Sequence, residues 1–208
     1  MMNMVSLLLF AAFGYLVGSI PTAYLLVKWR ANLDIRRVGS GNVGTLNSFE
    51  ATGSKRIGAA VLIVDLMKGL TAAGAGWRFG GAYEVGAVAA LAAVFGHNFP
   101  IWLSFKGGRG LATAAGAMLV LGWVVLPVWM VSWFVGYKVS EDVNVGNAIA
   151  TIVMVTLAFA LGSDLLQQWI PTETSVGTFR LFIALLALLI LVRLVDPVRE
   201  YITQRGSV

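Results

Sequence analysis

Long apolar runs alternate with short polar loops along the whole chain. Five runs are long enough to cross a bilayer as one helix each, and they cover residues 4–27, 57–77, 84–104, 148–169 and 177–195. A further run, 111–137, is too long for one ordinary span and too short for two full ones. Gly122 and Pro127 near its middle favour a turn, so this run predicts two short tilted helices or a re-entrant hairpin buried by its neighbours.

The positive charges set the orientation of these predicted helices. Most of them are Lys28, Arg30, Arg36, Arg37, Lys55 and Arg56 in the first loop, Lys106 and Arg109 in the second, Lys138 in the third, and Arg193, Arg199 and Arg205 in the tail. Residues 163–177 instead carry two acids and no Lys or Arg. Because cytoplasmic loops are enriched in Lys and Arg, the basic loops are predicted inside and the acidic one outside. The run 111–137 must then go out and return. The prediction is an all-α polytopic membrane helix bundle of about seven transmembrane helices, with the N-terminus outside and the C-terminus cytoplasmic.

Composition narrows the class of protein further. Apolar residues make up 58% of the chain and charged residues only 12%, whereas a soluble domain carries far more charge. We therefore expect residues 1–208 to form a single integral membrane domain in contact with lipid. The apolar N-terminal run lacks a basic start, which favours a first spanning helix over a cleaved signal. No cysteine is present, so disulfides and thiol chemistry are excluded. The net charge of +5 comes without a long basic run, so no nucleic-acid partner is expected.

The most informative polar stretch is Gly96-His97-Asn98-Phe99-Pro100, followed by Phe105-Lys106-Gly107-Gly108-Arg109-Gly110. It holds the chain's one histidine, two cations and four glycines between apolar runs. Polar groups next to lipid are costly and usually mark a site. Glycines let a backbone approach a ligand closely, and Lys and Arg supply charge for an anion. These residues predict a phosphate or carboxylate site at a membrane surface.

Other chemistries are not expected at this stretch. One histidine without any cysteine does not suggest a metal site. No G-x-S-x-G elbow is present for a Ser–His–Asp triad, and the fifth residue after His97 is Trp102, not an aspartate. Lys106 precedes its glycines, so the loop is not a Walker A motif.

A second polar segment runs from Asp34 to Gly44 in the first loop. Residues 39–44 match G-x-G-x-x-G, but a membrane helix precedes them where a dinucleotide site needs a strand. Backbone N–H groups around glycines can still form an anion-binding nest, to which Ser40 and Asn42 add side-chain donors. A flexible polar linker is the alternative interpretation of this segment.

Asp65 and Lys68 place two charges in the apolar run 57–77. Three positions apart on a helix, they share a face and can pair, and the cost of charge in lipid predicts that both face the interior. The sequence leaves open whether they form an internal ion pair or contact a ligand.

Together these motifs resemble those of the bacterial membrane acyl-phosphate:glycerol-3-phosphate acyltransferases. The matching residues, in the family's order and over nearly the whole chain, are Gly18-Ser19-Ile20-Pro21-Thr22, Arg36 to Gly44 with Asn47, Asp65-x-x-Lys68-Gly69, Gly96-His97-x-Phe99-Pro100, and Phe105-Lys106-Gly107-Gly108-Arg109-Gly110-x-Ala112-Thr113-Ala114. The resemblance implies a multi-pass protein of the cell inner (plasma) membrane with its site facing the cytoplasm. It implies transfer of a fatty acyl group from acyl phosphate to the 1-hydroxyl of glycerol 3-phosphate, which gives lysophosphatidic acid and phosphate in phospholipid biosynthesis. It also implies that no metal, CoA or acyl carrier protein takes part directly.

The same resemblance assigns roles to residues of this chain. His97, Lys106 and Ser40 become the expected catalytic residues. The expected phosphate-binding residues are Gly39, Gly41, Asn42, Asn47, Gly107, Gly108, Arg109 and Thr113, and further candidates for substrate contact are Asp65, Lys68, Asn144 and Asn147. Acyl phosphate is already an activated mixed anhydride, so the protein must position the hydroxyl and neutralise phosphate charge. No cofactor is expected, and a substrate phosphate oxygen is the expected base.

The chain departs from the family's pattern at several positions. Glu50 stands where the family has arginine, Asn144 and Asn147 where it has serines, and Tyr201 where it has asparagine. A carboxylate at position 50 would repel phosphate unless a cation such as Arg37 or Arg56 compensates for it. The alternative function is that of a divergent paralogue that binds phosphate or lipid without catalysis, or uses another acceptor. A small transporter is less favoured, because only 111–137 looks broken and no inverted counterpart is evident.

Overall fold

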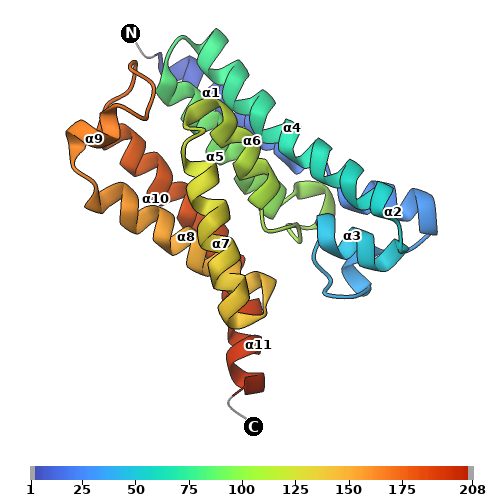
Figure 1. Cartoon of the computed structure of the whole chain (residues 1–208). Coiled ribbons are helices and arrows are strands. Elements are labelled where there is room, and N and C mark those ends of the chain that lie inside the picture. The colour runs from blue at the N-terminus through green and yellow to red at the C-terminus, as the bar shows by residue number, and fades with distance from the viewer. Residues whose placement is uncertain (1–2, 206–208) are drawn as a thin grey trace. The chain divides into compact units, whose positions relative to one another are not determined.

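Every regular element of residues 3–205, which this computed structural model describes, is a helix (Figure 1). The predicted all-α fold is therefore confirmed. The helices pack into two compact units that divide between Val120 and Leu121. The two chain ends, which the sequence predicts on opposite sides of a membrane, lie outside the described residues.

The N-terminal unit contains long apolar helices joined by short helical turns. Its elements in chain order are α1 (Met4–Ser19), α2 (Thr22–Ala31), η1 (Ile35–Arg37), α3 (Thr45–Thr52), α4 (Lys55–Gly80), α5 (Tyr83–Asn98), η2 (Ile101–Leu103) and α6 (Leu111–Leu121), whose last residue already belongs to the second unit. In this unit α1 and α4 both pack against α5.

The C-terminal unit is built around α8, against which its other long helices pack. Its elements are α7 (Val125–Ser140), α8 (Val143–Ala160), α9 (Ser163–Gln167), α10 (Val176–Val192) and α11 (Val195–Arg205). Tyr201 and Arg205 on α11 both donate hydrogen bonds to the carbonyl oxygen of Ser140, at 2.9 and 3.4 Å, which ties the last helix to the end of α7.

Small residues let the helices of the first unit approach closely. A Cβ on Gly14 or Gly18 of α1 would overlap with the carbonyl oxygens of Ala89 and Ala93 on α5. A Cβ on Gly69 of α4 would likewise overlap with the backbone at the start of α6. Glycines at such crossings are typical of helices that associate in a membrane, where burial of apolar surface does not drive association.

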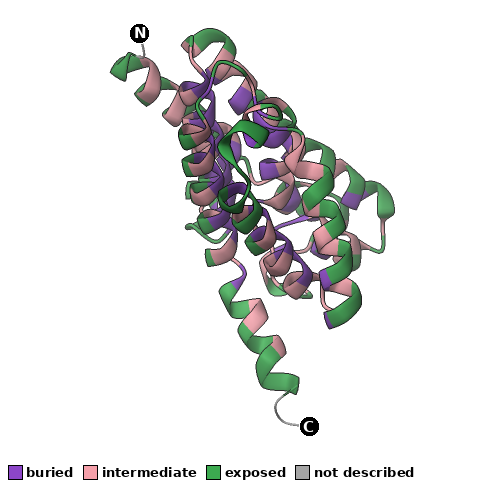
Figure 2. Cartoon of the chain, turned by 60° about the vertical axis from the view of Figure 1, so that its left-hand side comes forward, coloured by how far each residue is buried: buried purple, intermediate pink, exposed green. Residues whose placement is uncertain are grey.

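Large apolar side chains instead cover the outside of the helices. Leu8 is 65% exposed, Met130 63%, Val131 66% and Leu181 60%. Figure 2 shows exposed residues along the outer faces of the helices and buried residues on their inner faces. In water such a surface would be costly, whereas lipid tails solvate it well.

The observed helices refine the predicted spans. The run 4–27 does not form one continuous helix, because Pro21 offers no N–H and the helix ends at Ser19 and resumes at Thr22. The predicted turn near Gly122 is confirmed between α6 and α7, and Pro127 is accommodated in the first turn of α7. The predicted span 148–169 is wrong at both ends, because α8 covers Val143–Ala160 and a separate short helix follows.

Length and composition identify four helical stretches of the described chain that can cross a membrane. They are Met4–Ala31, Lys55–Gly80, Tyr83–Leu103 and Val143–Ala160, and the pair α10 and α11, bent by 53°, offers a fifth. The predicted number of about seven crossings and their orientation remain predictions.

Candidate functional site

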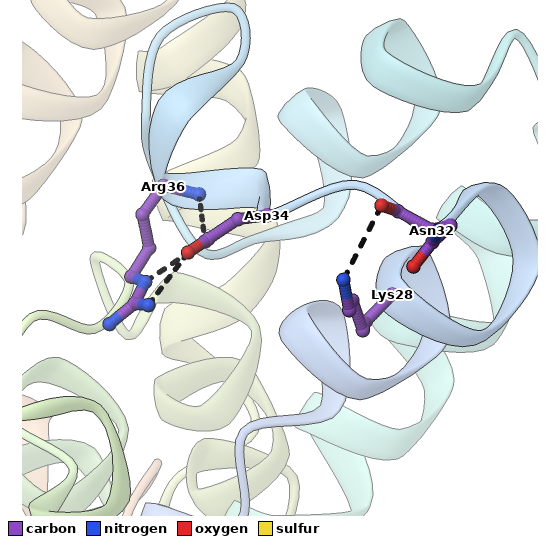
Figure 3. A network of polar contacts seen from close by, with 4 residues as sticks. All are labelled: Lys28, Asn32, Asp34 and Arg36. Atoms are coloured by element: carbon purple, nitrogen blue, oxygen red, sulfur yellow. Dashed lines mark hydrogen bonds and ion pairs between the residues drawn. The ribbon is translucent and has the colours of Figure 1, made fainter.

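The first polar loop, which joins α2 to α3, begins with an ion pair. The guanidinium of Arg36 donates two hydrogen bonds to the Asp34 carboxylate, from Nε at 2.9 Å and from Nη2 at 2.7 Å. Figure 3 shows this pair, with Lys28 donating to the carbonyl oxygen of Asn32 at the end of α2. The side-chain hydrogen bond from Arg36 lowers the pKa of Asp34 from 3.8 to about 2. The first two charged residues after α2, Asp34 and Arg36, therefore neutralise each other.

Asn47, in the first turn of α3, organises the rest of this loop. Its Oδ1 accepts a hydrogen bond from the Ser40 N–H at 3.1 Å. Its Nδ2 donates to the carbonyl oxygens of Ile35 at 3.2 Å, Val38 at 3.0 Å and Asn42 at 3.0 Å. Because Asn47 is only 1% exposed and its amide is committed to the backbone, it holds the loop in shape. The segment is a folded turn, so the flexible-linker interpretation is wrong.

Two glycines give this turn its path. Gly39 and Gly41 have φ of +57° and +68°, a backbone conformation that favours glycine. A Cβ on Gly39 would also overlap with Oδ1 of Asn47. Ser40 lies between the two glycines and is exposed, which leaves its hydroxyl accessible to a ligand.

Glu50 is exposed on α3, close to this turn. Its Oε2 lies 4.0 Å from the position that a Cβ on Gly39 would occupy. Glu50 takes part in none of the ion pairs of residues 3–205, so compensation of its charge by pairing with Arg37 or Arg56 is not found. A negative charge thus stands beside a loop that the sequence predicts to bind phosphate.

The second polar loop reverses direction directly after η2. Ser104 and Phe105 both have left-handed backbone conformations, with φ of +52° and +62°, which side-chain-bearing residues rarely adopt and which cluster at functional sites. The reversal lets the N–H groups of Gly107 and Gly108 donate to the carbonyl oxygens of the last two residues of α5, at 3.2 and 3.1 Å. These two N–H groups hold the loop against α5, and the side chain of Lys106 beside them is exposed.

The two loops meet at the imidazole of His97. A Cβ on Gly108 would overlap with His97 Nε2 and would lie 2.6 Å from the carbonyl oxygen of Val43 in the first loop. Glycine permits this approach because it has no side chain. His97 itself is the last residue but one of α5 and is 9% exposed.

A buried ion pair lies beneath His97. Lys68 Nζ is 2.6 Å from Asp65 Oδ1, and both side chains are buried, which confirms the predicted pairing. The same ammonium donates to the carbonyl oxygen of Ile20 at 2.6 Å, at the break between α1 and α2. Asp65 Oδ1 is also 3.8 Å from His97 Nδ1. A small cavity of about 10 Å³ adjoins the cluster, lined by residues 18 and 20–23, Val43, Pro100 and the three charged or titratable side chains.

The remaining predicted site residues are distributed around and away from this cluster. Arg109 is half-buried in the second loop, and Thr113 is fully buried at the start of α6. Asn144 and Asn147 belong to the second unit, in the first turns of α8. The Asn144 Oδ1 atom is buried without a hydrogen-bond partner among the described residues.

Sequence reasoning missed the contribution of the α1–α2 break to the site. The break supplies the Ile20 carbonyl oxygen to Lys68 and the buried Thr22 hydroxyl to the pocket lining. An Ile-Pro step inside an apolar run was the available signal, because the residue before proline disfavours the helical conformation.

Comparisons with known proteins agree on one family. A family model described as glycerol-3-phosphate acyltransferase matches residues 8–204. The glycerol-3-phosphate acyltransferase of Sinorhizobium fredii is 42% identical over 155 residues, which cover 74% of this chain and 75% of that protein. Glycerol-3-phosphate acyltransferase 2 of Thermotoga maritima is 37% identical over 153 residues, which cover 74% and 78%.

Solved structures extend the similarity to the three-dimensional fold. A crystal structure of PlsY (YgiH), an integral membrane glycerol 3-phosphate acyltransferase, in its glycerol 3-phosphate form matches with a TM-score of 0.80 at 29% identity, covering 96% of this chain and 94% of that one. Its lysophosphatidic acid form matches with a TM-score of 0.79 at 28% identity, covering 96% and 93%. Together with the apolar outer surface, this similarity identifies the chain as a membrane protein.

Proposed function

The chain belongs to the glycerol-3-phosphate acyltransferase family, and we propose that it transfers a fatty acyl group from acyl phosphate to the 1-hydroxyl of glycerol 3-phosphate. The products are lysophosphatidic acid and inorganic phosphate, and the reaction serves phospholipid biosynthesis. The observation that carries the proposal is the meeting of the two polar loops at His97, where Gly108 packs against the imidazole and the Val43 carbonyl.

The chemistry needs positioning and charge more than a protein nucleophile. The 1-hydroxyl oxygen attacks the acyl carbon, the bond from that carbon to the phosphate oxygen breaks, and the hydroxyl proton passes to a phosphate oxygen. His97, Lys106 and Ser40 are the proposed catalytic residues: His97 orients the hydroxyl, and Lys106 and Ser40 stabilise phosphate charge.

The proposed binding residues fall into two groups. Asn42, Arg109 and the first glycine turn contact phosphate, whereas Asn47, Gly107, Gly108 and Thr113 shape the loops from behind, because their polar or backbone groups are already buried or bonded. Asn144 and Asn147 are further proposed substrate-contacting residues.

We further propose that the protein spans the plasma membrane several times with this site on the cytoplasmic side. The support is the concentration of Lys and Arg in both loops of the site. The chain contains no cysteine, so Ser40→Cys introduces a single labelling target. A membrane-impermeant maleimide should label it only after the membrane is opened, and labelling from outside intact cells would reverse the orientation.

Purified protein tests the activity directly. Phosphate release from acyl phosphate should depend on glycerol 3-phosphate, and Lys106→Ala should reduce it by about 100-fold to 1000-fold, the typical loss for one preorganised charge contact. Lys138→Ala removes an exposed cation from the second unit and serves as the control. Binding of acyl phosphate without transfer would instead support the divergent, non-catalytic alternative, which the exposed Glu50 beside the first loop favours.

A further inference from the structure

Asp65 is an expensive residue in its surroundings. It lies in the middle of α4, a helix of apolar composition, and is 2% exposed. An ionised carboxylate so placed needs compensation, which Lys68 supplies one turn later at 2.6 Å. Stability alone does not explain such a pair, because well-packed apolar residues commonly replace a buried ion pair at no cost. The residues that surround Asp65 and Lys68 indicate a second role for this pair.

Lys68 fixes the position of the carboxylate. Its ammonium is held from one side by Asp65 Oδ1 and from the other by the carbonyl oxygen of Ile20, both at 2.6 Å. Ile20 precedes Pro21, whose ring fixes the backbone where the first apolar run is interrupted, and the Ile20 carbonyl oxygen also accepts the Thr22 N–H at 2.9 Å. The ammonium thereby ties the middle of α4 to a rigid point on the α1–α2 break.

The two nitrogens of His97 face different surroundings. Nδ1 is 3.8 Å from Asp65 Oδ1, on the buried side. Nε2 lies against the backbone of Gly108, on the side of the second loop. A carboxylate next to one ring nitrogen favours the tautomer with its proton there and leaves the other nitrogen as an acceptor. The 3.8 Å separation is longer than a hydrogen bond, and such contacts often tighten only when substrate is bound.

We propose that Asp65 is a positioning residue that sets the tautomer and orientation of His97, with Lys68 holding the carboxylate in place. In this arrangement His97 carries its proton on Nδ1, towards Asp65, and Nε2, which lies against the backbone of Gly108, is a hydrogen-bond acceptor. The effect on turnover rests on the acyl transfer proposed above, whereas the effect on the imidazole does not.

The imidazole can be observed without any assay of activity. Because His97 is the chain's one histidine, ¹⁵N-histidine labelling gives a single pair of ring-nitrogen NMR signals from purified protein in detergent. The parent should show a protonated Nδ1 and an unprotonated Nε2. Asp65→Asn should shift both signals towards a mixture of tautomers, and the exposed Asp164→Asn should leave them unchanged. Identical spectra for the parent and Asp65→Asn would overturn the proposal, whether or not the protein transfers acyl groups.

Kinetics then separate positioning from a merely structural ion pair. Asp65→Asn should lower kcat about 10-fold to 100-fold with little change in KM for acyl phosphate, because an imidazole in the wrong tautomer or orientation no longer orients the reacting hydroxyl. The double variant Asp65→Asn with Lys68→Met removes both charges and should regain thermal stability without regaining kcat. Recovery of kcat in the double variant would show that the pair serves stability only.

A double-mutant cycle tests whether Asp65 acts through His97. In a His97→Ala background, Asp65→Asn should change kcat by less than about 2-fold, since a residue that acts through His97 has nothing left to position. A loss as large as in the parent background would show that Asp65 acts independently of His97, and the proposal would be wrong.

Discussion

Replacing Asn47 by alanine should loosen the first polar loop and raise KM for glycerol 3-phosphate. The Asn47 side chain is the hub of the loop, since its Oδ1 accepts from Ser40 and its Nδ2 contacts three carbonyl oxygens. The variant removes all of these contacts and leaves a small cavity, because the residue is 1% exposed. Ser40 would then lose the bond that fixes its backbone.

The expected size follows from the hydrogen bonds. An amide NH₂ has two protons, so the three carbonyl contacts amount to two full bonds, and the Oδ1 contact adds a third. At about 1 kcal/mol net for each bond, the loss is about 3 kcal/mol. For a chain of this size that corresponds to a fall in Tm of about 6–12 °C. Asn47→Asp should be at least as damaging, because it turns a negatively charged oxygen towards carbonyl oxygens.

Thermal unfolding in detergent and steady-state kinetics check both parts of this prediction. Glu50→Gln, an exposed change on the same helix, should leave Tm within about 1 °C and is the control for stability. If Asn47→Ala keeps the parental Tm and loses only affinity, Asn47 contacts phosphate itself and does not organise the loop. If both Tm and KM are unchanged, the hydrogen-bond hub has no energetic importance.

Three further predictions concern the same unit. Gly108→Ala should abolish transfer, because its Cβ would overlap with His97 Nε2, and circular dichroism should show retained helix content while phosphate release is lost. Arg36→Met should return the pKa of Asp34 from about 2 towards 3.8; since the depressed pKa stabilises the fold above pH ~3.8, the Tm difference between parent and variant should be largest there and shrink as pH falls towards 2. Glu50→Arg should lower KM for glycerol 3-phosphate, because it places a cation beside the first glycine turn, and an unchanged KM would put position 50 outside the site.

The fold class was predictable because the apolar runs are long and contain few charged residues. Their boundaries were less predictable, and the errors have physical causes. Pro21 ends a helix inside an apolar run, which hydropathy alone does not register. The helix α8 starts at Val143 because Asp142 caps it, accepting hydrogen bonds from two backbone N–H groups at 2.7 and 2.9 Å. The start of α8 is therefore set by the Asp142 cap, and not by residue 148, where the apolar run begins.

The candidate site was predictable in its parts more than in its assembly. The spacing of Asp65 and Lys68 predicted their ion pair, because three positions on a helix bring side chains together whatever the tertiary fold. The approach of Gly108 to His97 could not be derived, because it depends on a chain reversal through two left-handed residues, Ser104 and Phe105, which are not typical of that conformation. The order of the motifs suggested that they share one site, but only the tertiary structure shows that Gly108 lies against His97.

Gly107 and Gly108 have a role that composition alone does not reveal. A glycine-rich loop suggests an anion nest by composition, yet the N–H groups of Gly107 and Gly108 are bonded to the end of α5. Their lack of a side chain matters for a different reason: it lets the loop close over His97 until its backbone touches the imidazole. In the second loop Gly107 and Gly108 therefore give shape, and the charge that this loop offers a phosphate must come from side chains. Lys106 is exposed next to these glycines, so Lys106→Ala is expected to lower kcat more than it lowers the stability of the fold.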